Sequence, residues 1–228
     1  MTRQLVSVIL PVHKQAEQIT TIVSGCADAL ARMTLDHEVL LVPNGGLATD
    51  AEACAALATA RPVVRSLPLT EGGWGRAVRH GLAAARGDLL CYTNSARTTP
   101  EDLVLMILYA AAHPGTVVKA NRKIRERLSR RVGSLLYNLE CRTLFDLSCW
   151  DVNGTPKVFP RSCDRLLRLT RNDDLIDAEF AAICREAGYP MIEVPIFSHR
   201  RHGGQSTTGW TSALRMYWGA YALWQAHR

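Results

Sequence analysis

The sequence predicts an α/β protein, a single domain built on a mostly parallel sheet that is flanked by helices. Short apolar runs rich in β-branched residues alternate with segments of helical period over the first 120 residues. Each run ends in polar or turn-forming residues, which is typical of parallel strands whose carboxyl ends carry a ligand site. The 228 residues are enough for one domain with a substantial core.

The first two strands and the helix between them carry clear signals. Residues 6–12 form an apolar, β-branched run that contains Pro11, as expected of a buried strand. A segment of helical period follows to about Met33. Residues 38–42 predict the second strand, and the Pro-Asn-Gly-Gly stretch at 43–46 predicts a turn at its carboxyl end.

The following segments repeat this order. An alanine-rich stretch at 49–59 predicts a helix, and residues 63–67 predict the third strand. The glycine-rich segment at 72–75 opens a helix that reaches Ala85, and residues 88–92 predict the fourth strand. A Pro-Glu-Asp sequence at 100–102 marks the start of another helix.

The second half continues with strands and helices of more mixed character. An apolar strand is expected at 116–120, and a basic amphipathic helix follows it. Trp210, Leu214, Tyr217, Tyr221 and Trp224 recur at helical spacing near the C-terminus. That stripe predicts either a helix that covers the core or an interfacial face.

Composition and charge narrow the class of protein. The net charge of +6 and the pI near 9.1 suit phosphate-bearing ligands or an anionic membrane surface, and nothing in the motifs points to nucleic acid. The seven cysteines are dispersed without a CxxC pair, which indicates reduced thiols. The N-terminus reads as a strand and not as a signal peptide, and no apolar run reaches the length of a membrane span. These features predict a cytoplasmic protein, with peripheral contact at the inner membrane face as a further option.

Six segments carry a resemblance to a known family. They are VSVILPVHKQAEQI, EVLLVPNGG, LTEGGWGRAVRHGLAAARGDLL, DVNGTPKVFPR, DAEFAAICREAGYPMIEVPI and RHGGQS. Their content and order resemble family 2 glycosyltransferases of the dolichyl-phosphate-mannose-synthase-like branch. The resemblance implies the GT-A fold, with a nucleotide-sugar half at about 1–120, an acceptor half at about 121–207 and an amphipathic helix at 208–228.

The resemblance also implies donor-binding positions at the ends of the first, second, fourth and fifth strands and at the glycine-rich helix start. These candidates are Pro11, Val12, His13, Gln15, Asn44, Gly45, Gly73, Arg76, Thr93, Asn94, Ser95 and Arg122.

The chain departs from this family at its acids. Gln15 stands where the family usually has Glu, and Pro43 and Asn44 stand where it has an Asp pair. The D-x-D motif is degenerate and falls on residues 93–95, which are Thr, Asn and Ser. Because a divalent cation needs hard anionic oxygens, we predict no metal site, although Mg²⁺ or Mn²⁺ stays possible.

Three functions are compatible with these departures. The first is an inverting, largely metal-independent transferase that neutralises a diphosphate with basic side chains and backbone amides. The second is a catalytically inactive binding or regulatory module, and the third is a transferase repurposed for a different donor. The motifs on the phosphate and acceptor sides favour the first, with a UDP- or GDP-linked sugar as donor. The acceptor would be a small molecule or a polyprenyl phosphate, and the oligomeric state is open.

The catalytic and acceptor-side candidates lie in the second half. By resemblance, Asp177 and Glu179 occupy a D-x-E position, and Asp177 would serve as general base for a hydroxyl acceptor. An acceptor phosphate needs no base, and acids in a first helical turn also stabilise the helix dipole. Arg201 would bind the leaving phosphate. The remaining acceptor-side or phosphate-side candidates are Asp151, Lys157, Gly204 and Ser206.

Overall fold

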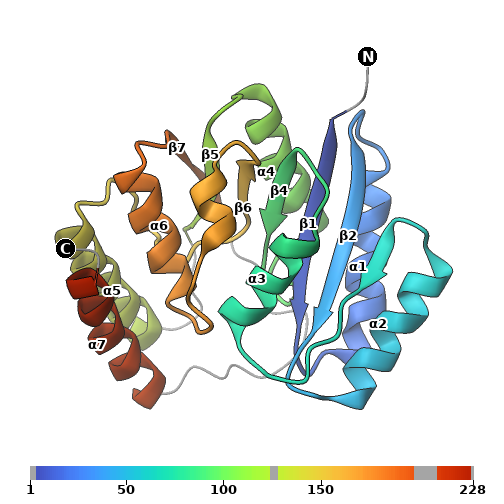
Figure 1. Cartoon of the computed structure of the whole chain (residues 1–228), viewed down its shortest axis with the longest axis horizontal. Coiled ribbons are helices and arrows are strands. Elements are labelled where there is room, and N and C mark those ends of the chain that lie inside the picture. The colour runs from blue at the N-terminus through green and yellow to red at the C-terminus, as the bar shows by residue number, and fades with distance from the viewer. Residues whose placement is uncertain (1–3, 124–127, 198–209, 227–228) are drawn as a thin grey trace.

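The computed structural model describes residues 4–123, 128–197 and 210–226, and it confirms the predicted α/β fold. In these residues one seven-stranded sheet has the order β3-β2-β1-β4-β6-β5-β7 (Figure 1). The strands are β1 (Leu5–Val12), β2 (Asp36–Pro43), β3 (Val64–Ser66), β4 (Leu89–Tyr92), β5 (Val117–Arg122), β6 (Lys157–Pro160) and β7 (Met191–Ile196). The helices are α1 (Ala16–Leu30), α2 (Ala48–Ala60), α3 (Trp74–Ala84), α4 (Pro100–Ala112), α5 (Leu128–Phe145), the 3-10 helix η1 (Asp164–Arg168), α6 (Ile176–Glu186) and α7 (Trp210–Ala226).

The sheet is mostly parallel, as predicted. Strands β1 to β4 pair in parallel, and so do β5 and β7. Strand β6 is inserted between β4 and β5 and runs antiparallel to both. Its four residues bring a polar segment of the second half next to the end of β4, which the order of elements in the sequence does not reveal.

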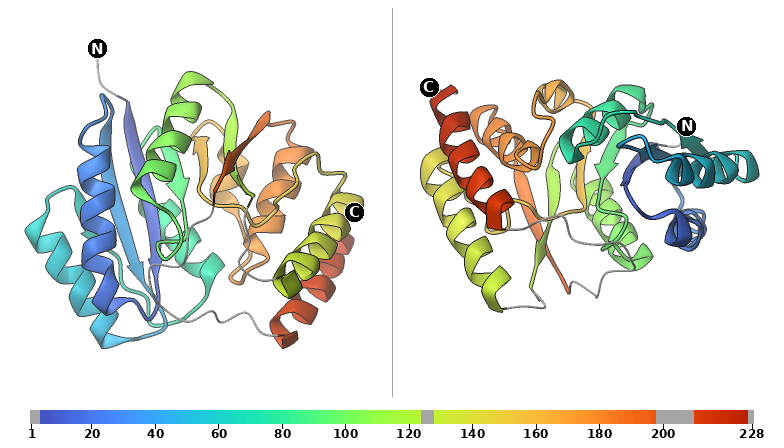
Figure 2. Two further views of the ribbon diagram at one scale, coloured as in Figure 1. Left: turned by 180° about the vertical axis from the view of Figure 1, so that it is seen from behind. Right: turned by 90° about the horizontal axis from the view of Figure 1, so that it is seen from below.

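Helices cover both faces of the sheet and one end. Helices α1, α2 and α4 pack on one face, which Figure 2 shows from behind, and α3, η1 and α6 pack on the other. Helices α5 and α7 lie side by side beyond the β7 edge, where they form a third apolar cluster with α6. The core is therefore one sheet between two helical layers, extended at the β7 end by a helical pair.

Local sequence explains where the helices nearest the site begin. Thr99 caps α4, because its hydroxyl accepts a hydrogen bond from the backbone N–H of Asp102 at 3.1 Å, and Pro100 occupies the first turn. Helix α3 begins at Trp74 directly after Gly73, whose φ of 140° lies outside the range that side chains tolerate well. Both starts lie at the edge of the sheet where β1, β2 and β4 end.

The cysteines and the helices bear on two further expectations. All seven cysteines are buried free thiols, in agreement with the predicted reduced state. Among the described residues, no helix combines the length and the apolar character that crossing a membrane requires.

Candidate active site

The predicted donor-binding residues of β1, β2 and β4 meet at the carboxyl edge of the sheet, the lower edge in Figure 1. The side-chain amide of Asn44 donates to the carbonyl of Val12 at 2.9 Å. The ring Nδ1 of His13 lies 3.0 Å from the Asn44 carbonyl oxygen, and the ring packs against Gly45, whose φ is +87°. Ser95 donates to the Pro11 carbonyl at 3.1 Å. These bonds fix three strand ends relative to one another.

The turn at residues 93–98, where we predict a degenerate D-x-D motif, uses its polar groups internally. The hydroxyls of Thr93 and Thr98 share a hydrogen bond, and the Oδ1 of Asn94 accepts from the N–H of Ala96 at 3.0 Å. The Ser95 hydroxyl oxygen also lies 2.7 Å from the Oε1 of Gln15. The side-chain oxygens of Thr93, Asn94 and Ser95 therefore all take part in hydrogen bonds within the protein.

Gln15 leaves one donor unused at this edge. Its side chain is 5% exposed, and its Nε2 has no hydrogen-bond partner in the described part of the chain. Asp50 of α2 fixes the backbone of this turn, because its carboxylate accepts hydrogen bonds from the N–H groups of Lys14 and Gln15 at 2.6 and 2.9 Å. An unpaired buried amide is costly, so a polar ligand that accepts from Nε2 would be stabilised here.

A divalent cation does not fit the side chains of Thr93, Asn94 and Ser95. Hydroxyl and amide groups are weak ligands for Mg²⁺ or Mn²⁺, and the hydrogen bonds just described occupy them. In the ranges that the structure describes, no group of three or more His, Cys, Asp or Glu side chains could hold a metal ion.

The glycine-rich start of α3 packs against the loop before α6. A Cβ on Gly73 would lie 2.5 Å from the carbonyl oxygen of Asn172, and one on Gly75 would lie 2.4 Å from that of Arg171. The N–H of Gly73 points to the Oδ1 of Asn44 at 3.3 Å, and the N–H of Arg76 donates to Asn172 at 3.0 Å. The N–H groups of Gly73 and Arg76 are thus already bonded within the protein. The short Cβ distances at Gly73 and Gly75 indicate that these glycines allow α3 to pack closely on the loop before α6.

The predicted basic residues on α3 differ in their surroundings. Arg76 forms an ion pair with Glu71, beside the glycine turn. Arg79 is exposed, and its guanidinium donates to the Thr170 carbonyl at 3.0 Å and to the Oδ1 of Asn172 at 2.5 Å. Arg79 therefore ties α3 to the loop before α6, and Arg76 lies nearer the strand ends.

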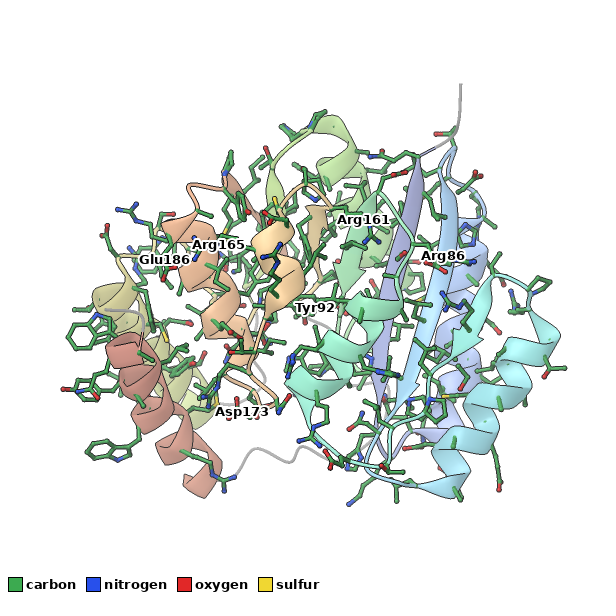
Figure 3. The ribbon with its side chains drawn as sticks, viewed as in Figure 1. Arg86, Tyr92, Arg161, Arg165, Asp173 and Glu186 are labelled. Atoms are coloured by element: carbon green, nitrogen blue, oxygen red, sulfur yellow. The ribbon has the colours of Figure 1, made fainter. Side chains whose placement is uncertain are left out.

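Asp177, the predicted base, lies in a buried cluster where α3, β4, β6 and α6 meet. Its Oδ1 accepts from the ammonium group of Lys157 and, at 2.9 Å, from the hydroxyl of Tyr92. Its Oδ2 accepts from the indole N–H of Trp74 at 3.2 Å. Figure 3 labels Tyr92 between α3 and α6. Three donors from three elements therefore fix the Asp177 carboxylate. Two of them bond to Oδ1 and one to Oδ2, so Oδ2 can accept one more hydrogen bond.

Burial shifts the proton affinity of the groups around Asp177. The Lys157 side chain is fully buried, and this burial lowers its pKa, while the Asp177 carboxylate opposes that shift. Burial and the neighbouring Asp177 raise the pKa of Tyr92 well above its ordinary value. Tyr92 therefore stays a neutral donor, and Lys157 contacts Asp177 instead of facing solvent.

A second buried network lies beneath the end of β5. The Arg122 side chain and backbone donate to the Asp151 carboxylate, with side-chain distances of 2.8 Å. Burial alone would lower the pKa of Arg122, but Asp151 outweighs it and raises that pKa. The fully buried Lys119 pairs with Glu193 at 2.8 Å and donates to the Asp151 carbonyl. Asp151 is thus bound to Arg122 at the end of β5, and its role on the acceptor side stays a prediction.

The two networks are connected across the sheet. Tyr92, Lys157, Lys119 and Glu193 are successive register partners on β4, β6, β5 and β7. Sequence reasoning missed Tyr92, Lys119 and Glu193, because strand periodicity assigns such positions to the core and does not reveal which polar residues pair there. The lysines in otherwise apolar strands were the available signal.

Glu179 has a clear structural task. Its carboxylate accepts from the backbone N–H and the hydroxyl of Thr170, at 2.8 and 2.6 Å, and from the N–H of Arg171 at 2.9 Å. These bonds anchor the loop that receives Gly73 and Gly75. A catalytic role for Glu179 stays a prediction that this geometry does not favour.

Some predicted residues lie outside the described part of the chain. They are Arg201, Gly204 and Ser206, together with the His residues at 199 and 202. In the C-terminal stripe, Tyr217 packs edge to face on Tyr137 and donates to the Gly133 carbonyl, whereas Tyr221 is exposed. The stripe is therefore divided between core contacts and surface.

The fold and this polar strand edge define an α/β protein of the GT-A type, as predicted. The chain belongs to glycosyl transferase family 2, whose sequence model matches residues 7–163.

Relatives in sequence and in structure agree with that assignment. An undecaprenyl-phosphate 4-deoxy-4-formamido-L-arabinose transferase of Sodalis glossinidius (strain morsitans) is 24% identical over 210 residues, covering 88% of this chain. This chain spans 62% of that relative's length. Glucosyl-3-phosphoglycerate synthase from Mycobacterium tuberculosis, crystallised with Mn²⁺, UDP and phosphoglyceric acid, superposes with a TM-score of 0.74 at 16% identity, over 97% of this chain and 78% of that one. A mycobacterial protein matches with a TM-score of 0.74 at 20% identity, over 97% of this chain and 74% of that one.

Proposed function

We propose that the protein transfers a sugar, with inversion, from a nucleoside diphosphate sugar to an oxygen of a polyprenyl phosphate or a small molecule. The observation that carries this proposal is the convergence of polar groups from β1, β2, β4 and β5 at one sheet edge, within a family 2 glycosyltransferase. The relative from Sodalis acts on undecaprenyl phosphate, and the mycobacterial synthase was crystallised with UDP, so both ends of the proposed reaction have precedents.

The donor would bind across the ends of β1, β2 and β4. The buried side-chain amide of Gln15, which has one atom without a partner among the described residues, supplies one polar contact for the nucleotide. Asn44 and Asn94 follow β2 and β4, the two strands that flank β1, and Arg76 and Arg122 are the basic candidates for the diphosphate. Arg201, Gly204 and Ser206 would complete the phosphate side by resemblance.

The reaction itself would be a direct displacement. An acceptor oxygen attacks the anomeric carbon while the bond from that carbon to the diphosphate oxygen breaks, and the nucleoside diphosphate leaves with the electron pair. Guanidinium groups and backbone amides would stabilise the negative charge that develops on the leaving group, with little role for a metal. The amide and hydroxyl groups at residues 93–95 support this choice, because they are poor ligands for a divalent cation.

Asp177 would act on the acceptor side. With Oδ1 held by Lys157 and Tyr92, Oδ2 is the oxygen that could accept a proton from an acceptor hydroxyl. A phosphate acceptor is already anionic and would need no proton transfer, so Asp177 would then act by orienting Trp74 and the glycine turn.

Product formation tests this proposal against an inactive binding module. Purified protein would be incubated with UDP- and GDP-sugars and either a polyprenyl phosphate or hydroxyl acceptors, and products would be identified by mass spectrometry. We expect transfer from one donor class that falls at least about a hundredfold in Asp177→Asn if the acceptor is a hydroxyl. Asp173→Asn, at an exposed acid outside the cluster, is the matched control and should keep its activity.

Two outcomes would contradict the proposal. Nucleotide-sugar binding without any product would favour the inactive module, and absence of both would favour a different donor. Arg201→Ala separates the phosphate side from the rest, because it should weaken donor binding; unchanged affinity would remove Arg201 from the site.

A further inference from the structure

We propose that the outer face of α5, together with Trp150, docks on an anionic membrane surface. This inference extends the proposed function, and it rests on that function only in one respect: a lipid-phosphate acceptor would be presented at a bilayer.

The outer face of α5 is apolar although it is exposed. Leu135, Leu136 and Leu139 are 56%, 55% and 61% exposed, and their spacing of three and four residues places them on one side of the helix. The opposite side, with Tyr137 and Cys141, packs into the cluster formed with α6 and α7. Large exposed apolar groups that adjoin one another mark an interaction surface more often than scattered ones do.

An aromatic and a basic group continue this surface along the helix. Arg142 follows Leu139 by one turn, and its guanidinium carbon lies 3.8 Å from the ring centroid of Trp150. The Trp150 side chain is 62% exposed. A tryptophan stacked on an arginine suits the depth of lipid headgroups, where the ring meets apolar chains and the cation meets phosphate.

The charge around α5 distinguishes a membrane from a second copy of this chain. In the sequence, residues 123–131 carry five Lys or Arg and one acid, Glu126. From Gly133 to Phe145 the single acid is Glu140, whose Oε2 is buried. A second copy of this chain, with its net charge of +6, would add positive charge at this face, whereas an anionic bilayer complements a basic sequence.

The surface is linked to the acceptor side of the sheet. The N–H of Lys123 donates to the carbonyl of Ile196 at 3.0 Å, and Phe197, which follows Ile196, is 61% exposed. Helix α5 begins at Leu128, five residues after Lys123 in the sequence, and β5 and β7 end side by side at Arg122 and Ile196. A protein docked through α5 would hold this edge near the bilayer.

Flotation of the full chain with lipid vesicles tests the inference. Vesicles of phosphatidylcholine, with and without phosphatidylglycerol and without any acceptor lipid, would be compared at low and at physiological salt. We expect binding to the anionic vesicles, weakened by salt, and a loss of about tenfold or more in the partition coefficient of Leu135→Glu/Leu139→Glu. Leu105→Glu/Leu108→Glu on α4 makes the same change at exposed leucines of another helix, and its binding should match the wild type.

Several results would overturn this assignment. They are failure of the wild-type chain to float with anionic vesicles, an equal loss in both double variants, and self-association that only the α5 variant abolishes while flotation persists. The single variant Leu136→Glu serves if the double variant does not fold, which circular dichroism would reveal. Because the vesicles contain no acceptor, failure of the proposed transfer reaction would leave the flotation result unchanged.

Discussion

At the scale of single residues, the carboxylate of Asp177 depends on donors that come from other elements. Removing the Tyr92 hydroxyl in Tyr92→Phe keeps the ring contacts with Trp74 and Phe180 but takes one donor from a buried acid. We expect a loss of about 1–2 kcal/mol in the free energy of unfolding, measured by urea denaturation. Tyr109→Phe, at an exposed ring, is the control and should change it by less than about 0.5 kcal/mol. Equal stability of both variants would contradict the role given to Tyr92.

Glu38 predicts how stability depends on pH. Burial alone would raise its pKa, but hydrogen bonds from Ser7, Arg86 and Arg65 outweigh burial and hold the pKa at about 2. A group whose pKa is depressed in the folded protein stabilises above its unfolded pKa, near 4.5, and loses that contribution as the pH falls toward 2. The full shift corresponds to about 3 kcal/mol.

The measurement for Glu38 is the free energy of unfolding across that pH window. We expect Glu38→Gln to be less stable than the wild type at neutral pH and to show a flatter decline as the pH falls. Asp28→Asn, in an exposed ion pair with Arg61, should retain the wild-type slope. If the free energy of unfolding of Glu38→Gln fell with pH as steeply as that of the wild type, Glu38 would not be the source of the pH dependence.

Residue types at the site were predictable, but their partners were not. Asn44, Gln15 and Ser95 lie together because each follows or ends a parallel strand, which the sequence pattern indicates. The pairing of Lys157 with Asp177 depends on β6 lying antiparallel beside β4, and no local pattern specifies that neighbour. Residues 177 and 157 were therefore identified as site candidates without their mutual contact.

At the scale of elements, the start of α3 tests why glycines occupy residues 72–75. In Gly75→Ala the new Cβ would meet backbone oxygens of Arg171 and Asp173 at 2.4 and 2.7 Å, so α3 or the loop must shift. We expect a loss of about 1–3 kcal/mol in the free energy of unfolding and weaker donor binding. Thermal denaturation and calorimetric titration measure the two effects.

Gly133→Ala supplies the contrast for that experiment. No atom lies within 4 Å of a Cβ at Gly133, which is in α5, so alanine should stabilise the protein by up to about 1 kcal/mol. If Gly75→Ala were as stable as Gly133→Ala and bound the donor as tightly, close packing at the start of α3 would contribute neither to stability nor to donor binding.

Sequence periodicity predicted the elements better than their surfaces. Strand β1 and helix α2 lie within a few residues of the predicted ranges, and α4 begins at Pro100, where a helix start was predicted. The aromatic stripe of α7 obeys helical spacing, yet Tyr217 is partly covered by α5 whereas Tyr221 is exposed. A stripe shows which residues share a face, but only the packing of α5 beside α7 decides how much of that face is covered.

At the scale of the whole molecule, the polar side chains at the ends of β1, β2 and β4 form one connected set of amides and hydroxyls. Gln15 and Ser95 bond to each other, and Asn44 joins two strand ends and the glycine turn. The edge is therefore built from amides and hydroxyls, with basic side chains at its margins. A donor diphosphate at this edge would be neutralised by cationic side chains and by N–H donors instead of a metal.

The most direct test of this account is calorimetric titration of the full chain with UDP, GDP and their sugar conjugates, in EDTA and in Mn²⁺. We predict that one nucleotide class binds with an affinity in the micromolar range that is the same in both conditions, because the residues at 15, 44 and 93–95 supply no carboxylate for a cation. Binding that requires Mn²⁺ and disappears in EDTA would contradict the account, and so would the absence of binding in both.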